Sequence, residues 1–393
     1  MIQRDYLIIG GGIGGASACE GIRKYDKRGS VTLVGAEVFH PYKRWILSKD
    51  FLREKTPQIK KLAVLDERWY DSHKIERRLD AVVTQFNIDR RLAVLGNGES
   101  IEFNKACLAM GSRPVRPPVA GVGLGNVIYL RTIRDALALR EMATLEKTVM
   151  VVGGGLLACE TAASLRQVKL KVSVMHRNSY LLNRYADAEL GVWLTEYFAK
   201  HGVTMLMGES LNGFEGKTVL RNIQTKSGNR VPAGLAVVAC GAEPNLDLVR
   251  NTPLSGPHGS PVTDYLETEE KGIYAIGDLA FYPDRMMGGV RRQTHWENAR
   301  EQGLVAGANM TGKKRQRYEQ IPYFWTEMFD LHLDFVGDFS VQPTRVDLRG
   351  TYAKKKFSAR YYQGERLRAI LLCNQTPREA ESAKTELKNA LGK

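Results

Sequence analysis

Three glycines near the start of the chain have a spacing that suits phosphate binding. Gly10, Gly12 and Gly15 follow an apolar segment, Tyr6–Ile9, and precede a helical pattern. In a G-x-G-x-x-G turn the first glycine permits the tight turn, the second lets the backbone approach a pyrophosphate, and the third lets helix and strand pack closely. The helix also presents free N–H groups and the positive end of its dipole. We call this segment the first glycine turn and expect it to bind a dinucleotide.

An acidic residue follows at the distance that this reading requires. A second apolar strand is expected over Val31–Val34, and Glu37 comes just after it. A carboxylate about 20 residues beyond the glycines accepts hydrogen bonds from ribose hydroxyls. The ordered set of strand, glycines, helix, strand and acid is more specific evidence for dinucleotide binding than the glycines alone.

The pattern recurs in the middle of the chain. A strand is expected over Thr148–Val152, then Gly153, Gly155 and Ala158 form G-x-G-x-x-A, and a second strand spans Lys171–Met175. This second glycine turn predicts a second nucleotide cofactor.

Cationic residues close the second pattern, where an acid closes the first. His176 and Arg177 end its second strand, and Arg184 follows. Cationic groups at this position suit a 2′-phosphate, which favours NADPH over NADH. The alternative is that they only decorate the surface.

Other side chains could serve a redox cofactor. Lys43, Arg44 and Lys49 could neutralise a pyrophosphate or lie beside a redox ring, or they could form an exposed basic helix. Asp278 follows a short apolar strand, at the end where doubly wound sheets bind ligands. Trp296, near the start of a helix that runs to about Asn309, could stack on a ring or pack in the core.

The composition excludes several classes of protein. The 393 residues, 43% hydrophobic and 25% charged, suffice for two or three globular domains. No apolar run approaches a membrane span, and the first strand leaves no room for a leader peptide. Five Cys without C-x-x-C and seven His without ligand spacing predict no disulfide scaffold and no metal. We expect a cytoplasmic protein.

The net charge of +14 suggests an acidic partner, which could be a small acidic protein, nucleic acid or an anionic surface. The densest basic runs are Lys313–Arg317 and Lys354–Lys356. Either run alone could simply be a solvated face.

The remaining elements complete an α/β chain, whose C-terminal region has a different pattern of expected strands and helices. We expect a β-meander over residues 75–109, a helix over Leu190–His201, and a second meander ending at Leu235–Gly241. The C-terminal region should be a small α+β domain, with strands at Pro322–Trp325, Leu331–Val336, Tyr352–Phe357 and Leu367–Cys373 and a helix at Pro377–Leu391.

The order of motifs resembles the FAD-dependent ferredoxin reductases of the pyridine-nucleotide reductase superfamily, the rubredoxin and putidaredoxin reductase type. Apoptosis-inducing factors share that fold. The resemblance covers nearly the whole chain, including IIGGGIGG, PYKRWILSK, LAMGSRP, VVGGGLLACE, YAIGD and HWENAREQG. It implies two Rossmann-like domains, for FAD (1–113 and 243–318) and NAD(P)H (114–242), and a C-terminal domain (319–393).

The resemblance also implies roles for individual residues. FAD would be bound by residues at several strand ends and by three cations: Gly10, Gly12, Gly15, Glu37, Arg44, Lys49, Val83, Ala109, Gly111, Arg131, Asp278 and Trp296. The nicotinamide coenzyme would be bound by the second glycine turn and its surroundings: Gly153, Gly155, Ala158, His176, Arg177, Arg184 and Gly241. Lys49 and Glu160 would pair beside the hydride-accepting nitrogen and act catalytically.

The implied activity is electron transfer from NAD(P)H through FAD to an acidic ferredoxin or rubredoxin, by a monomer or a homodimer. Two alternatives stay open: a redox-sensing interaction protein of the apoptosis-inducing-factor kind, for which nucleic acid is a less favoured partner, and a quinone-type reductase. The family's usual Arg-Pro-Pro is replaced here by Arg44-Trp45-Ile46. Neither a dithiol at the first helix nor a Cys at Pro41–Arg44 is present, which disfavours thiol chemistry.

Overall fold

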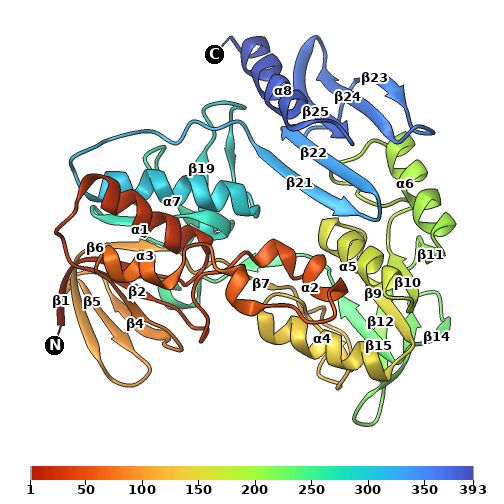
Figure 1. Ribbon diagram of the computed structural model, residues 1–393, viewed down its shortest axis with the longest axis horizontal. Helices are drawn as coiled ribbons and strands as arrows, with labels where there is room; N and C mark the ends of the chain where they lie inside the picture. Colours follow the sequence, from red (N-terminus) through yellow and green to blue (C-terminus); the bar gives the residue numbers. More distant parts are fainter. Residues whose placement is uncertain (1, 393) are drawn as a thin grey trace. The chain divides into compact units, whose positions relative to one another are not determined.

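The computed structural model describes residues 2–392, and these residues form two compact units (Figure 1). The first unit contains residues 2–43, 58–113 and 244–324, and the second contains residues 44–57, 114–243 and 325–392. Two short strands, β7 (Ser112–Pro114) and β16 (Ala242–Pro244), lie where the chain passes from one unit to the other. Each unit contains a parallel sheet, so the predicted α/β class is confirmed. The predicted domain boundaries stay a prediction.

The first unit is built on a parallel sheet with an antiparallel extension. Its strands are β1 (Ile2–Ile9), β2 (Val31–Val34), β3 (Ile75–Arg78), β4 (Val83–Asn87), β5 (Leu92–Leu95), β6 (Ser100–Leu108) and β18 (Ile273–Ala275). They follow the order β3-β2-β1-β6-β5-β4, and β18 pairs with β6. The meander predicted over residues 75–109 is wrong at its first strand, because β3 pairs in parallel with β2 and only β4, β5 and β6 are antiparallel neighbours.

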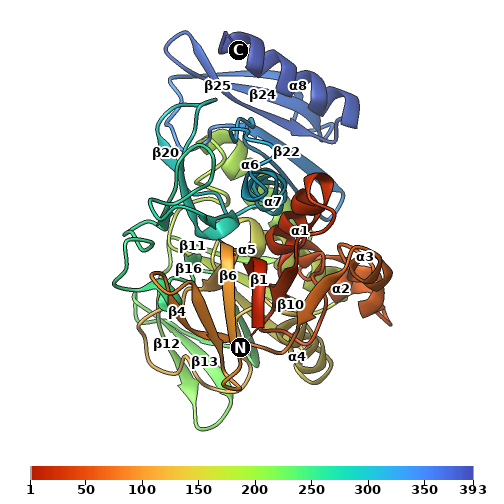
Figure 2. The same cartoon turned by 90° about the vertical axis from the view of Figure 1, so that its left-hand side faces the viewer.

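Two long helices cover one face of this sheet. Helices α1 (Ile13–Tyr25) and α7 (Trp296–Met310) lie side by side (Figures 1 and 2) and share a core cluster with Ile8 and Leu33. Their backbones approach so closely that a Cβ added to Gly307 would lie 2.2 Å from a carbonyl oxygen of α1. This close approach fixes the start of α7 relative to the first glycine turn.

The smaller elements of the first unit connect these main ones. They are α3 (Glu67–Ser72), the 3₁₀ turns η2 (Ile59–Leu62), η3 (Asp247–Val249) and η4 (Gly277–Leu279), and the strands β17 (Ser260–Pro261), β19 (Ala280–Pro283) and β20 (Val290–Arg291).

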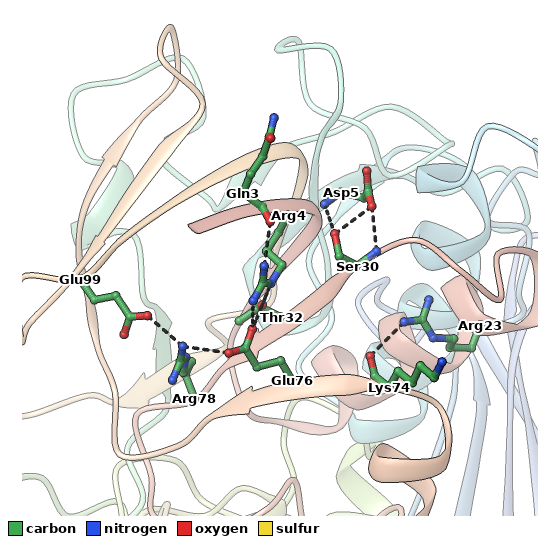
Figure 3. Close-up of polar contacts among 10 residues, drawn as sticks. All are labelled: Gln3, Arg4, Asp5, Arg23, Ser30, Thr32, Lys74, Glu76, Arg78 and Glu99. Atoms are coloured by element: carbon green, nitrogen blue, oxygen red, sulfur yellow. Dashed lines mark hydrogen bonds and ion pairs between the residues drawn. The ribbon is translucent and has the colours of Figure 1, made fainter. Parts of the chain in front are cut away.

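A polar network ties the parallel strands together (Figure 3). Arg4 donates to Glu76 (Nη2···Oε2, 2.6 Å) and to Thr32 (2.9 Å), and Arg78 bridges Glu76 (2.8 Å) and Glu99 (2.9 Å). Burial of Glu76 opposes its ionisation, but the hydrogen bonds from Arg4 and Thr32 lower its pKa below the usual value. The network therefore links β1, β2 and β3 with the turn before β6.

The second unit contains a five-stranded parallel sheet with helices. Its strand order is β11-β10-β9-β15-β8, and the predicted strand over Thr148–Val152 is confirmed as β9. The other strands are β8 (Val127–Ile128), β10 (Lys171–His176), β11 (Thr204–Met207) and β15 (Leu235–Val238), and the helices are α2 (Asp50–Arg53), α4 (Ile133–Leu145), α5 (Leu156–Gln167) and α6 (Ala188–Lys200), with a 3₁₀ turn η1 (Arg44–Ile46). A separate antiparallel sheet contains β12 (Leu211–Gly216), β13 (Leu220–Thr225) and β14 (Arg230–Pro232).

The C-terminal part forms a five-stranded sheet with one helix. The strand order is β21-β22-β25-β24-β23, from β21 (Tyr323–Met328), β22 (Leu331–Gly337), β23 (Arg345–Thr351), β24 (Lys356–Gln363) and β25 (Arg366–Cys373). Helix α8 (Pro377–Ala390) buries Ala380, Ala383 and Leu387.

One predicted C-terminal strand, Tyr352–Phe357, is wrong. Residues 352–355 form the turn between β23 and β24, with Lys355 at φ 51°. The aromatic residues that suggested a strand are there because Tyr352 and Phe357 pack against Trp193 of α6, with ring centroids 5.2 and 5.6 Å away. Among residues 2–392, no helix is both long enough and apolar enough to cross a membrane.

Candidate functional site

The first glycine turn leaves an open cradle at the start of α1. Gly10 has φ +130°, and a Cβ there would lie 2.1 Å from the carbonyl oxygen of Ala109. Gly12 is the N-cap residue of α1 and has no side chain to cap the helix. A Cβ on Gly12 would meet nothing within 4 Å. Uncapped N–H groups facing open space fit a pyrophosphate, so these residues suit a dinucleotide.

The same edge of the sheet gathers other predicted residues. Because β1, β2, β6 and β18 are parallel, their carboxyl ends meet at one edge. Glu37 follows β2 and accepts a hydrogen bond from Tyr42 (Oη···Oε2, 2.8 Å). Ala109 and Gly111 follow β6, and the Ala109 N–H donates to the carbonyl of Ile9 (2.8 Å).

Asp278 lies in η4, after β18, and is 8% exposed. Ser112 donates to its carboxylate (Oγ···Oδ2, 2.6 Å), and the side chain of Gln302 accepts from the N–H of Gly277 (2.7 Å). Sequence reasoning missed Ser112 and Gln302, although Ser112 directly follows Gly111. These bonds hold the Gly277–Asp278 turn in place.

Trp296 is the first residue of α7, preceded by the N-cap residue His295. His295 is partly buried and stacks on Phe324, with centroids 3.8 Å apart. Burial lowers the pKa of His295 to about 4, so its ring is neutral at physiological pH. Val83 begins β4 and packs in a core cluster with Ile9, while Gly15 is buried within α1.

The second glycine turn has the same construction as the first. Gly153 has φ +134°, and a Cβ there would lie 2.3 Å from the carbonyl oxygen of Ala239. Gly155 is the N-cap residue of α5 without a side-chain cap, and a Cβ on it would meet nothing within 4 Å. Ala158 is fully buried, and Gly241, at φ +122°, follows β15. This turn also fits a dinucleotide pyrophosphate.

The three cationic residues at the end of β10 differ in their exposure. A Cβ on Gly154 would lie 2.4 Å from the ring of His176, and His176 Nε2 is 3.1 Å from Asn183 Oδ1. Burial lowers the pKa of His176. Arg177 and Arg184 are exposed, and these two arginines supply the permanent positive charge at the end of this strand.

A buried ion pair joins Lys49 to Glu160 in the second unit. The Lys49 Nζ lies 2.9 Å from Glu160 Oε1, and the side chains are 5% and 10% exposed. Lys49 is also 3.4 Å from the carbonyl of Trp45 and 4.6 Å from the ring centroid of Trp325. The predicted pairing of Lys49 with Glu160 is thus present in the geometry.

Two hydroxyl groups complete the environment of Glu160. Ser48 donates to Oε2 (2.5 Å) and Thr326 donates to Oε1 (2.6 Å). A buried ion pair is tolerable when hydrogen bonds satisfy the remaining lone pairs, and these hydroxyls supply them. Sequence reasoning missed both, although Ser48 is the neighbour of Lys49.

Arg44 and Arg131 also come together in the second unit. Arg44 Nη1 donates to the carbonyl of Arg131 (2.8 Å). The N–H of Arg131 donates to Asp135, whose carboxylate also forms the capping box with Thr132 at the start of α4. The Arg44 guanidinium is therefore held against the backbone just before the capped start of α4. The role of both arginines, like that of every predicted site residue, stays a prediction.

Two further observations concern cysteine and metal chemistry. All five cysteines are free, and four of them are buried. Over residues 2–392, no group of three or more His, Cys, Asp or Glu is placed to hold a metal ion.

The chain matches two protein families and several curated proteins. Residues 4–303 match the family described as pyridine nucleotide-disulphide oxidoreductase, and residues 323–390 match the family described as reductase C-terminal. The chain is 31% identical over 344 residues to the benzene 1,2-dioxygenase system ferredoxin–NAD(+) reductase subunit of Pseudomonas putida, covering 88% of this chain and 83% of the relative. It is 30% identical over 381 residues to rhodocoxin reductase of Rhodococcus erythropolis, covering 96% and 88%.

Solved structures agree with these similarities. Putidaredoxin reductase in its covalent complex with putidaredoxin has a TM-score of 0.93 and 27% identity, over 99% of this chain and 94% of that one. A ferredoxin reductase from Rhodopseudomonas palustris has a TM-score of 0.90 and 27% identity, over 94% and 91%. The chain therefore belongs to the pyridine nucleotide-disulphide oxidoreductase family, as an oxidoreductase of the ferredoxin reductase type.

Proposed function

We propose that the protein transfers electrons from a nicotinamide coenzyme, through FAD, to an acidic ferredoxin-type protein. The observation that carries the proposal is the pair of glycine turns, each opening on free space at an uncapped helix N-terminus. Two such cradles suit two dinucleotides, and relatives are named as ferredoxin–NAD(+) reductases. When bound, the flavin accepts a hydride and releases electrons singly.

The first unit is proposed to hold FAD. Gly10 and Gly12 receive the pyrophosphate, Glu37 binds the ribose, and Asp278, held by Ser112, binds the ribityl chain. Trp296 would lie against the ring system. The uncapped turn at Gly155 receives the pyrophosphate of the nicotinamide coenzyme.

Lys49 is proposed to place a positive charge beside the flavin. Glu160 holds the ammonium at 2.9 Å, and Ser48 and Thr326 orient the carboxylate. A fixed cation stabilises negative charge that develops on a reacting ring, especially where water is excluded. The pair thus supports hydride acceptance without taking part in a covalent step.

The coenzyme is proposed to be NADPH in preference to NADH. The basis is the exposed charge of Arg177 and Arg184, which suits a 2′-phosphate. His176 contributes less, because burial lowers its pKa. The five free cysteines fit the cytoplasmic setting that we propose for the reaction.

The experiment is anaerobic stopped-flow reduction of the purified, FAD-loaded protein. We expect a yellow protein whose flavin is bleached by NADPH faster than by NADH, and whose reduced form then reduces an acidic ferredoxin within seconds. Faster bleaching by NADH would overturn the coenzyme preference alone. Slow reoxidation by every ferredoxin, with rapid reaction of a quinone or with dimerisation on reduction, would overturn the proposed acceptor.

A further inference from the structure

The indole of Trp325 links Lys49 to a second charged group. Trp325 lies in β21, and its ring is contacted by the Lys49 ammonium at 4.6 Å from the centroid. The ring of His332, in β22, stacks on the same indole with centroids 5.5 Å apart and planes 19° apart. All three residues belong to the second unit. Lys49 and His332 are therefore neighbours through one aromatic side chain.

Two carboxylates hold the imidazole of His332. Its Nδ1 is 3.3 Å from Glu327 Oε1, and its Nε2 is 3.3 Å from Asp334 Oδ1. Asp334 is only 4% exposed, so its charge needs a partner inside the protein. Asn374 fixes the backbone, because it accepts from the His332 N–H (2.7 Å) and donates to the His332 carbonyl (2.8 Å).

These contacts make His332 a cation over most of the physiological range. The hydrogen bonds with Asp334 and then with Glu327 raise the pKa of His332 to about 9. The charged groups around it are Asp334 on its own strand and Glu327 on the neighbouring strand β21. The hydrogen bond with His332 is the largest cause that lowers the pKa of Glu327. The charges of Lys49 and Arg53 lower it further, so Glu327 interacts electrostatically with both cations.

Loss of the proton from His332 would change the forces on Lys49. The neutral imidazole leaves Glu327 and Asp334 without their shared counter-charge. Glu327, which already interacts electrostatically with Lys49, then competes with Glu160 for the ammonium. A shift of the ammonium by a fraction of an ångström is enough to affect a reaction that depends on its position.

We propose that His332 is a positioning residue: stacked on Trp325 and paired with Glu327 and Asp334, it keeps the Lys49 ammonium on Glu160. The inference rests on the proposed role of Lys49 at the flavin. It adds a pH limit to that role. Flavin reduction should be fastest while His332 is protonated and should slow as pH rises through about 9.

The test compares three variants of the FAD-loaded protein by stopped-flow between pH 6 and 10. His332→Gln removes the charge, and we expect reduction about three- to tenfold slower than wild type below pH 8, without an inflexion near pH 9. His332→Arg retains a permanent charge that can stack on an indole and pair with carboxylates, so we expect the wild-type rate, also without that inflexion. His258→Gln, at an exposed histidine of the first unit, should behave as wild type.

A second measurement does not depend on turnover. NMR of protein labelled with ¹³C-histidine should show one imidazole, absent in His332→Arg, that titrates at about pH 9. Glu327→Gln should move that midpoint toward 6.5, the ordinary histidine value. A His332 signal that titrates near 6.5 in the wild type would overturn the proposal.

The outcomes separate this inference from the proposed function. If Lys49→Ala slows flavin reduction while His332→Gln leaves its rate and pH profile unchanged, only the role of His332 fails. If Lys49→Ala reduces its flavin at the wild-type rate, the role of Lys49 fails, and the positioning role of His332 fails with it. If His332→Gln does not fold, the pH profile of flavin reduction by His332→Arg still tests the inference. A profile without an inflexion near pH 9 supports it, and a retained inflexion contradicts it.

Discussion

Glu160 binds one cation and two hydroxyl groups, and these partners come from two distant places in the sequence. Lys49 and Ser48 directly precede α2, whereas Thr326 lies in β21, 166 residues after Glu160. The carboxylate is therefore held from two sides. Removing either charge leaves the other buried without compensation.

We predict that Lys49→Met and Glu160→Gln each destabilise the fold by about 3 kcal/mol, because a broken buried pair leaves one unpaired charge. The double variant should regain much of this stability, since no charge is left buried. Urea unfolding of the four proteins measures the coupling. Equal and additive losses would show that the two side chains do not interact.

The same variants separate stability from chemistry. Lys49→Met should slow flavin reduction about 100-fold, the order of effect seen when a fixed electrostatic group is removed from a reacting centre. The double variant should stay slow although it is stable. Lys55→Met, at an exposed lysine nearby in sequence, serves as the control. A double variant with the wild-type rate would contradict the role given to Lys49.

At the scale of single residues, charge and position marked Lys49 as a candidate, but its pairing with Glu160 was predicted only through resemblance. No local pattern marks a residue in a strand as the partner of a residue on a distant helix. Thr326 was therefore missed, since nothing in the segment around it shows that its hydroxyl reaches Glu160. Ser112 was missed for the same reason, because Asp278 is 166 residues away.

The two glycine turns are the elements whose chemistry can be tested most directly. Gly12 and Gly155 have φ of −94° and −86°, which alanine adopts freely, and both face open space. Gly10 has φ +130° and faces the carbonyl of Ala109. Substitution at these three positions therefore distinguishes a lost ligand from a lost fold.

We predict that Gly12→Ala folds normally but retains FAD at least about tenfold less tightly, because the added methyl group occupies space meant for a phosphate. Gly155→Ala should keep its flavin and bind the nicotinamide coenzyme more weakly. Gly10→Ala should misfold. Circular dichroism, flavin content and coenzyme titration measure these effects, and normal flavin retention by Gly12→Ala would contradict the assignment.

Most elements could be predicted because short apolar runs lie between clear turn signals. Val31–Val34 and Thr148–Val152 form strands with the predicted bounds, as expected for strands buried in a parallel sheet. Tyr352–Phe357 failed because its aromatic residues serve contacts with Trp193 and not strand alternation. The pairing of β18 with β6 was also beyond reach, since it depends on residues far apart in the chain.

On the scale of the whole molecule, charge is the property most relevant to the acceptor. The net charge is +14, and exposed charges are screened over about 10 Å at 0.1 M salt. A field of this sign steers an acidic protein toward the surface and raises the association rate. It has little influence on an uncharged acceptor.

We predict that the second-order rate of ferredoxin reduction falls about tenfold or more between low and high salt. Reduction of a neutral quinone by the same protein should change little and serves as the control. Stopped-flow mixing over a range of ionic strength measures both rates. An acidic acceptor whose rate is independent of salt would rule out electrostatic steering.

Each compact unit is assembled from three separate stretches of chain, and this has a consequence for synthesis on the ribosome. The first unit needs residues up to 324, and the second needs residues beyond them. Neither can close while the middle of the polypeptide is still being made, although their early strands are already exposed. Nascent chains should therefore rely on chaperones at least until residues beyond 324 have been synthesised.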